Sequence, residues 1–242
     1  MTSSTTKTKK IPIEHIEEVK SAKCQAMRLE NIPGPEEIRA FHDAIARPDI
    51  FQEHMYAEPW HRWRLDRAKE ILKLMLLLCP QSRVLEVGCA DGILTEWLAG
   101  RAESVTGVDV AKLAIGRCKK LKLGNADFFC GTFAEYVAAK ESEGCKVEGY
   151  DLAIISSVLE HIPDPVEELR LLTDHAKWIL ASVPINETPN PDAFNAELFY
   201  HPRKCADGTG HIWYFRPDTF QALFREVVLY EDNGVNAILV GR

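Results

Sequence analysis

Short apolar runs alternate along this chain with stretches in which apolar residues return at helical spacing. Val84–Val87, Val105–Asp109 and Asp151–Ser156 are apolar runs that predict buried strands. Leu94 and Leu98 lie four positions apart between two of these runs, which predicts an intervening helix. Strands that alternate with helices are typical of an α/β fold with a parallel sheet.

The same reading divides the chain into parts. A helix is predicted from Pro59, a first-turn proline, to about Leu78, and another begins near Asp164. Near the C-terminus, a helix that begins around Pro217 precedes two further strands. The predicted parts are a disordered tail (1–10), a helical cover (11–80) that either covers the site or packs on the sheet, and a core (81–242) with an inserted lid (184–215).

The chemistry is expected at the turn that follows the first strand. Gly88 and Gly92 bracket this turn, where backbone must bend tightly and let a ligand approach. The dinucleotide fingerprint G-x-G-x-x-G is not met, because the residues from Gly88 read Gly, Cys, Ala, Asp, Gly. Glu86 and Asp91 would repel a pyrophosphate, and Asp109 lies at about the spacing of a carboxylate that holds a ribose diol. These residues suit a nucleoside with a cationic amino-acid tail, not NAD.

This pattern resembles the class I S-adenosylmethionine-dependent methyltransferases, whose turn reads E-x-G-x-G or a near variant. Here it reads EVGCADG from Glu86, with Ala90 in place of the middle glycine, and the resemblance covers roughly residues 56 to 183. It implies S-adenosylmethionine as cofactor and a Rossmann-like, seven-stranded, mostly parallel sheet with helices on both faces and a final antiparallel hairpin. The cofactor-binding residues that it implies in the core are Glu86, Gly88, Cys89, Ala90, Asp91, Gly92, Asp109, Val110, Thr132, Phe133, Ser156 and Ser157.

The segment before the core looks like the nodulation-factor N-methyltransferases, which place a Pro-Trp segment just upstream. In that resemblance Tyr56, Trp60 and Arg64 would lie over the methionine tail of the cofactor. Alternatively, Trp60 and Trp63 pin their helix to the sheet, because aromatic side chains bury large areas wherever they pack.

Residues 184–215 are predicted to cover the acceptor, with aromatic faces suited to a sugar ring or a planar ligand; a purely structural cover is the alternative. His161 and His211 are the predicted catalytic residues, since a histidine can accept a proton from an acceptor hydroxyl near neutral pH. The alternative interpretation is that His161 is part of the scaffold and bonds to backbone near the cofactor. The aromatic residues of this lid are Phe194, Phe199, Tyr200, Trp213, Tyr214 and Phe215.

The leading interpretation is therefore a methyltransferase that acts on an amine or hydroxyl of a small molecule, such as a sugar or amino sugar, with no metal ligand assigned. An alternative is metal-assisted 2′-O-methylation of RNA 3′ ends, because Glu160, His161 and His211 resemble part of the metal-binding set of those enzymes, although Ser157 replaces a further Glu. A third interpretation is a cofactor-binding protein without turnover.

Composition narrows the choice of partners. The 242 residues carry a formal net charge of −7, which argues against a nucleic-acid surface. Seven cysteines without C-x-x-C spacing predict reduced thiols in a cytoplasmic protein, and no apolar run is long enough to span a membrane. The expected partner is a small-molecule acceptor, and a homodimer is left open.

Overall fold

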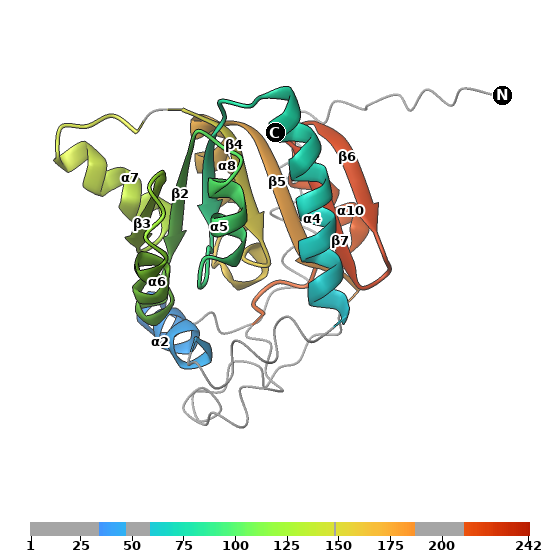
Figure 1. Ribbon diagram of the computed structural model, residues 1–242. Helices are drawn as coiled ribbons and strands as arrows, with labels where there is room; N and C mark the ends of the chain where they lie inside the picture. The colour runs from blue at the N-terminus through green and yellow to red at the C-terminus, as the bar shows by residue number, and fades with distance from the viewer. Residues whose placement is uncertain (1–33, 47–58, 148, 187–210) are drawn as a thin grey trace.

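The computed structural model describes residues 34–46, 59–147, 149–186 and 211–242. The described residues form a seven-stranded sheet with helices on both faces (Figure 1), as predicted. Its order is β3-β2-β1-β4-β5-β7-β6, in which β1 to β5 are parallel and β7 is antiparallel to both β5 and β6. The strands are β1 (Arg83–Val87), β2 (Ser104–Asp109), β3 (Ala126–Cys130), β4 (Tyr150–Ser156), β5 (Ala176–Pro184), β6 (Val227–Asp232) and β7 (Asn236–Gly241).

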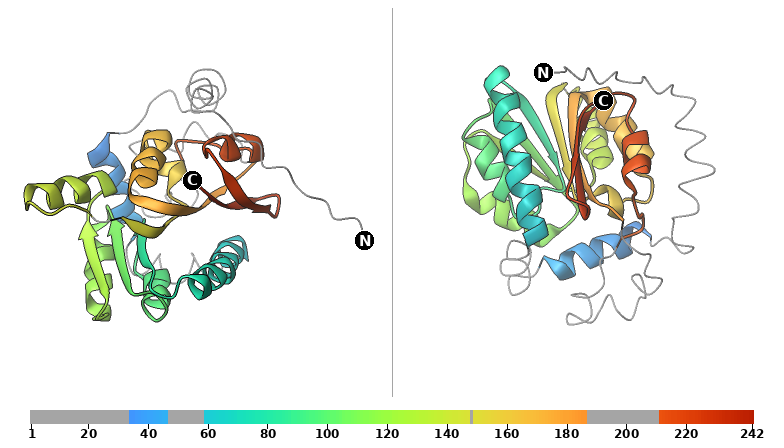
Figure 2. Two further views of the ribbon diagram at one scale, coloured as in Figure 1. Left: turned by 90° about the horizontal axis from the view of Figure 1, so that it is seen from above. Right: turned by 90° about the vertical axis from the view of Figure 1, so that its right-hand side faces the viewer.

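The helices that join these strands cover the sheet as two layers (Figure 2). In β4, Leu152 and Ile154 pack with α4 and α5, while Ala153 and Ile155 pack with the other layer, because successive side chains of a strand point to opposite faces. The helices are α2 (Pro35–Ile45), α4 (Pro59–Leu78), α5 (Ile93–Ala99), α6 (Lys112–Cys118), α7 (Phe133–Ser142), α8 (Pro165–His175) and α10 (Pro217–Ala222), with short 3-10 turns η2 (Lys119–Leu121) and η3 (Leu159–His161).

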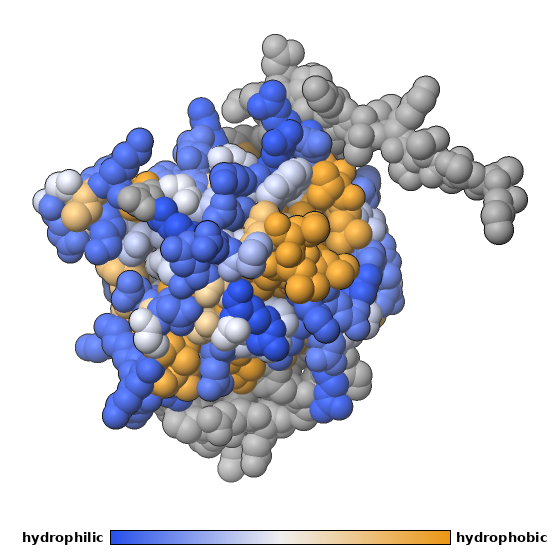
Figure 3. Space-filling view, turned by 45° about the horizontal axis from the view of Figure 1, so that its top comes forward, coloured by the Kyte–Doolittle hydropathy of each residue, from blue (hydrophilic) through white to orange (hydrophobic). Residues whose placement is uncertain are grey.

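Helix α4 begins at the predicted Pro59 and packs on the sheet with Ala68, Ile71, Leu72 and Leu76. Its outward side carries three exposed leucines, and the apolar patch in Figure 3 lies at the end of the molecule where α4 ends. Among the described helices, none is both long enough and apolar enough to cross a membrane. The exposed leucines are Leu74, Leu77 and Leu78.

Helix α2, in contrast, lies across the carboxyl ends of the strands (Figure 2, right). Asp43 accepts a hydrogen bond from the Leu113 backbone N–H at 3.3 Å, and the Arg117 guanidinium donates to the Ala46 carbonyl at 2.7 Å. Arg39 pairs with Glu135 of α7. This helix therefore lies where a cover over the site is expected, while the tail and the first predicted helix lie outside the described residues.

Most of the predicted lid, residues 187–210, also lies outside the described part of the chain. Its end is described, and Trp213 and Phe215 are only 9% and 3% exposed within the main core cluster. Burial of these two rings favours the alternative of a structural cover at this end of the segment, and binding of a ligand by its aromatic faces stays a prediction. Trp213 and Phe215 are apolar side chains of a segment that adds to the core beside η3, where Trp213 Nε1 donates to the Ile162 carbonyl at 2.8 Å.

The packing of α4 gives a test with a matched control. Leu72→Ala should lower the free energy of unfolding by about 2–5 kcal/mol, because Leu72 is fully buried and its removal leaves a cavity. Leu77→Ala, on the exposed side of the same helix, should change it by less than about 0.5 kcal/mol. Urea unfolding measures both, and equal losses would contradict the described orientation of α4.

Candidate active site

The turn from β1 to α5 is held in an unusual backbone conformation. The φ angles of Gly88, Ala90 and Gly92 are +73°, +47° and +85°, all in the left-handed region that favours glycine. A Cβ on Gly88 would lie 2.2 Å from the Val158 side chain, so the turn and the segment after β4 approach each other closely. Ala90, at the middle-glycine position, adopts this conformation with a side chain, which costs on the order of 1 kcal/mol.

Asp109, at the end of β2, holds this turn in place. One carboxylate oxygen accepts the Ala90 backbone N–H and the other accepts the Ala111 N–H, both at 2.8 Å. Each oxygen retains capacity for a further hydrogen bond, because a carboxylate oxygen offers two lone pairs. Asp109 therefore positions the turn and can still accept bonds from a diol.

Three carboxyl groups with raised pKa values surround the turn. The pKa of Glu86 is raised to about 8, chiefly by burial and in smaller part by the negative charges of Asp109 and Asp91, although Thr95 donates to Glu86 at 2.6 Å and opposes the shift. Burial also raises the pKa of Asp91 and of Asp109. Oδ1 of Asp91 is buried and has no hydrogen-bond partner among the described residues. The turn thus gathers carboxyl groups whose ionised forms a nearby cation would stabilise.

Cys89 lies in the turn, but its side chain points beneath it. Its thiol packs with Ile115, Cys118 and Phe128, and the Cys118 thiol donates to the Ala90 carbonyl at 3.1 Å. The hydrogen bond with Cys118 and burial raise the pKa of Cys89, which keeps this thiol protonated. Only the backbone of Cys89 is therefore placed to meet a ligand above the turn.

The residues predicted near adenine divide into two groups. Thr132 caps α7. Its hydroxyl accepts the backbone N–H of Glu135 at 3.1 Å, and its own N–H donates to the side-chain carboxylate of Glu135 at 2.8 Å. Phe133 is fully buried and packs against Tyr136 and His175. The first turn of α7 directs the Phe133 ring into the core, so the predicted contact of this residue with adenine would involve its backbone, and it stays a prediction. Val110, directly after Asp109, is partly exposed.

Ser156 and Ser157 end β4 beside the turn. The hydroxyl of Ser156 shares a 2.7 Å hydrogen bond with the hydroxyl of Ser182. Ser157 has a φ of +57°, and its buried hydroxyl has no partner among the described residues. A left-handed residue that is not glycine marks a strained point at the carboxyl end of the central strand.

The predicted catalytic histidines lie together. The rings of His161 and His211 are 4.8 Å apart, and the ring of His42 from α2 lies 5.1 Å from that of His161. Burial lowers the pKa of His42 to about 4, so this imidazole is neutral at pH 7. The backbone N–H groups of Ile212 and Trp213 both donate to the Glu160 carbonyl, at 2.7 and 3.1 Å, which ties the two segments to each other.

Sequence reasoning missed His42, because it lies far along the chain from the residues that it meets and no motif marks it. The upstream residues stay predictions: Tyr56 lies outside the described residues, and Trp60 is described only as part of α4. Arg64 is buried on α4.

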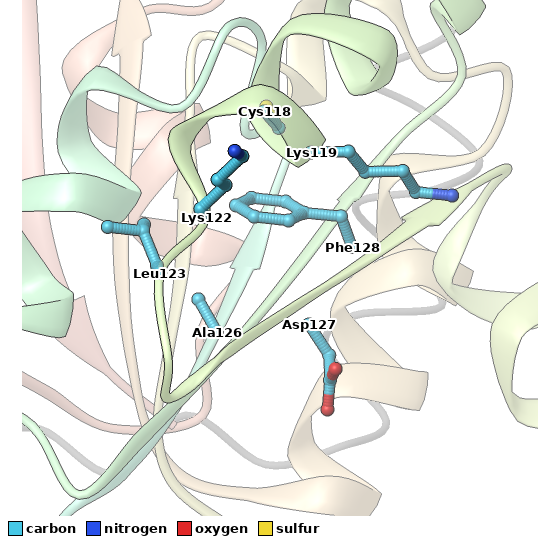
Figure 4. A pocket seen from close by; sticks show the side chains of 7 residues that line it. All are labelled: Cys118, Lys119, Lys122, Leu123, Ala126, Asp127 and Phe128. Carbon is cyan, nitrogen blue, oxygen red and sulfur yellow. The ribbon is translucent and has the colours of Figure 1, made fainter.

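A surface pocket lies elsewhere, between η2 and β3 (Figure 4). It is lined by Cys118, Lys119, Lys122, Leu123, Ala126, Asp127 and Phe128. None of the predicted site residues lines this pocket, so it does not coincide with the candidate site.

Comparisons with known proteins agree with this fold. Residues 51–227 match the family model described as a methyltransferase domain. Ubiquinone biosynthesis O-methyltransferase of Nitrosospira multiformis is 34% identical over 116 residues, which cover 46% of each chain. The Pseudomonas aeruginosa protein of the same name is 39% identical over 90 residues, which cover 36% of this chain and 37% of that protein. This chain thus spans less than half the length of the curated relatives it matches.

Two solved structures show the same fold. The N-methyltransferase NodS of Bradyrhizobium japonicum, in complex with S-adenosylhomocysteine, matches with a TM-score of 0.57 at 18% identity, over 85% of this chain and 97% of that chain. Magnesium protoporphyrin IX methyltransferase of Synechocystis, with bound S-adenosylmethionine, matches with a TM-score of 0.58 at 14% identity, over 87% and 98%. With a family model that covers most of its length and this seven-stranded fold, the chain belongs to the class I S-adenosylmethionine-dependent methyltransferases.

Proposed function

We propose that this chain transfers the methyl group of S-adenosylmethionine to a hydroxyl oxygen of a small-molecule acceptor. The observation that carries the proposal is the set of three carboxyl groups around the turn after β1, Glu86, Asp91 and Asp109. Their raised pKa values support a site that disfavours further negative charge and favours a cation. The cofactor carries two cationic groups, an ammonium and a sulfonium, and no phosphate.

Each carboxyl group has a distinct role in this proposal. Asp109 accepts hydrogen bonds from the ribose diol with its remaining lone pairs. Asp91, whose Oδ1 lacks a protein partner among the described residues, pairs with the ammonium group. Glu86, held by Thr95 beneath the turn, keeps its proton near neutral pH without ligand, and a cation at the same end of the site favours its ionised form.

The other predicted cofactor-binding residues contribute by where they lie in the site. The backbone of Gly88, Ala90 and Gly92 lets the cofactor lie close to the turn, since side chains are small or absent there. In this proposal, the site is limited at the end of β4 by Ser156 and Ser157. On the adenine side it is limited by Val110 and the backbone around Thr132. Tyr56, Trp60 and Arg64 remain the predicted cover of the methionine tail.

A hydroxyl acceptor is favoured over an amine by the other half of the site. A neutral amine can attack the methyl group without a base, whereas a hydroxyl must lose a proton during or before transfer. Three titratable side chains lie close together at the carboxyl end of β4, where such a proton can be accepted. They are Glu160, His161 and His211. The relatives at 34% and 39% identity are named O-methyltransferases, which supports the same choice.

The reaction itself is an in-line displacement. The acceptor oxygen forms a bond to the methyl carbon as the carbon–sulfur bond breaks, and the electron pair of that bond stays on sulfur to give S-adenosylhomocysteine. Because charge is dispersed as the sulfonium becomes a thioether, alignment and exclusion of water supply most of the acceleration. Val158 lies close to Gly88, so the turn after β1 and the segment after β4 are held against each other.

The direct test combines binding with an acceptor screen. Calorimetry should show binding of S-adenosylmethionine and S-adenosylhomocysteine and none of NAD. With methyl-labelled cofactor, small phenols and sugars should become labelled on oxygen more readily than their amino counterparts. Absence of cofactor binding, or labelling of amines alone, would contradict the proposal.

The role of Asp91 can be separated from the fold. Asp91→Asn should weaken the binding of S-adenosylhomocysteine at least tenfold, about 1.4 kcal/mol, because it removes the charge opposite the ammonium group. The melting temperature without ligand should not fall, since a buried charge is removed. The control is Glu96→Gln, an equal charge change at an exposed position of α5, which should leave both values unchanged. Unchanged affinity in Asp91→Asn would exclude this ion pair.

Glu86 predicts how stability without ligand depends on pH. Its pKa is about 8 in the folded protein against an ordinary 4.5, so between these values the folded state keeps a proton that the unfolded chain has released. The free energy of unfolding therefore falls as pH rises through this range. Glu86→Gln, which keeps an acceptor for Thr95, should remove this part of the fall, so that its advantage over the parent grows by at least about 1 kcal/mol from pH 5 to pH 8.

Urea unfolding at each pH measures this advantage, with Glu96→Gln as the control that should follow the parent. Parallel curves for Glu86→Gln and the parent would show that Glu86 is ionised in the fold throughout this range.

A further inference from the structure

We propose that the pocket between η2 and β3 binds a small organic anion with a single ring, and that this ligand is an effector of cofactor binding. The pocket has a volume of about 220 Å³. A cavity of roughly 150 Å³ is enough to hold a benzene molecule. The pocket therefore has room for one ring that carries an acidic group.

The pocket lies in a basic part of an acidic protein. The whole chain has a formal net charge of −7, yet four of the six residues 117–122 are basic. Two of these four, Lys119 and Lys122, line the pocket. A single exposed lysine gains little from an ion pair, but two at one hollow create a positive potential that attracts an anion.

Apolar side chains complete the lining. Phe128 of β3 lines the pocket together with Leu123 and Ala126, and Figure 4 shows the Lys122 side chain alongside the Phe128 ring. Asp127 also belongs to the lining, but in the same view it points away from this ring. A ligand ring can thus pack on Phe128 while its acidic group reaches the Lys122 ammonium. This combination favours an organic anion over a neutral ring and over an inorganic anion.

The backbone of the pocket is formed before a ligand binds. Lys122 follows η2 directly and has a φ of +53°, a left-handed conformation that ends the helical turn. The short connection to β3 is fixed by Asn125, whose side-chain amide donates to the carbonyls of Ala99 and Ala102 at 3.0 and 3.2 Å. Binding therefore requires ordering of side chains only, which lowers its entropic cost.

One wall of the pocket also supports the turn after β1 from beneath. Cys118, at the end of α6, lines the pocket, and its thiol donates to the Ala90 carbonyl at 3.1 Å. Leu121 of η2 lies so close to the turn that a Cβ on Gly92 would be 2.9 Å from its Cδ1. The end of α6 and η2 are thus in direct contact with the turn.

The Phe128 ring provides a second connection. A Cβ on Gly107 of β2 would lie 2.9 Å from Phe128 Cδ1 and 3.0 Å from Cys89 Sγ. Phe128 also packs on the apolar cluster beneath the turn, to which Cys89 belongs. Because closely packed interiors transmit displacements, a ligand that holds Phe128 and η2 in place also holds the turn in its left-handed conformation.

Occupation of the pocket should therefore strengthen binding of the cofactor, and the cofactor should strengthen occupation of the pocket by the same factor. This effector role rests on the proposed function, since it requires the cofactor to lie on the turn after β1. Binding of the anion in the pocket does not rest on it.

The experiment uses the full chain and follows the probe 4-fluorobenzoate by fluorine NMR. The probe should bind saturably with a dissociation constant in the millimolar range, as expected for a ligand of about ten non-hydrogen atoms. Neutral 4-fluorobenzamide should bind at least threefold more weakly, because it lacks the charge. Inorganic phosphate, added as a competitor, should also be at least threefold weaker, because it lacks the ring.

Two variants test the two halves of the pocket. Lys122→Gln and Phe128→Leu should each weaken binding of 4-fluorobenzoate at least threefold. The matched control is Lys120→Gln, an equal charge change in the same basic run at an exposed residue outside the pocket lining, which should bind the probe as the parent does. Melting temperatures report whether each variant is folded, and Lys122→Gln, at an exposed position, keeps the test decisive if Phe128→Leu does not fold.

Binding of S-adenosylhomocysteine separates this inference from the proposed function. With the probe at saturation, the parent should bind S-adenosylhomocysteine at least twofold more tightly, and Lys122→Gln should need more probe for the same gain. Absence of saturable probe binding, or equal weakening by Lys120→Gln and Lys122→Gln, would refute the pocket site and leave the proposed function standing. Probe binding with unchanged affinity for S-adenosylhomocysteine would refute the effector role. Probe binding by a protein that binds no S-adenosylhomocysteine would refute the proposed function and leave the pocket site standing.

Discussion

The carboxylate of Asp109 is the group on which the site depends. Its two oxygens accept the N–H groups of Ala90 and Ala111, and these bonds hold a turn that contains three residues in left-handed conformations. Without them, the conformation of Ala90 would have little to offset its cost. The strand order places Asp109 correctly, because β2 lies beside β1 and both strands end at the same edge of the sheet. The turn after one strand is thus shaped by the acid that ends its neighbour.

This arrangement concentrates carboxyl groups where water is scarce. Glu86 lies beneath the turn, Asp91 within it and Asp109 beside it, and burial is the largest cause of the raised pKa in all three. Such a site is costly to keep empty and favours a ligand that carries positive charge. The electrostatics of the protein and the chemistry of the cofactor are complementary in this sense.

The mouth of the site is built from distant parts of the chain. Helix α2 contributes His42, η3 contributes Glu160 and His161, and the segment before α10 contributes His211. Backbone hydrogen bonds to Glu160 join two of these segments, and Trp213 and Phe215 anchor the second segment in the core. The C-terminal end of the segment that the sequence predicts as a lid is therefore a fixed part of the wall of the candidate site.

The sequence by itself determined the local features, namely the strands from apolar runs and the turn from Gly88 and Gly92, and the acids around that turn led to the prediction of a cationic ligand. These follow from short-range rules, because a strand, a tight turn and a flanking charge are each specified within a few residues. Only the tertiary structure decided that Phe133 points into the core and that His42 and His211 meet His161. Helix orientation and long-range pairing depend on how elements pack, and no local pattern carries that information.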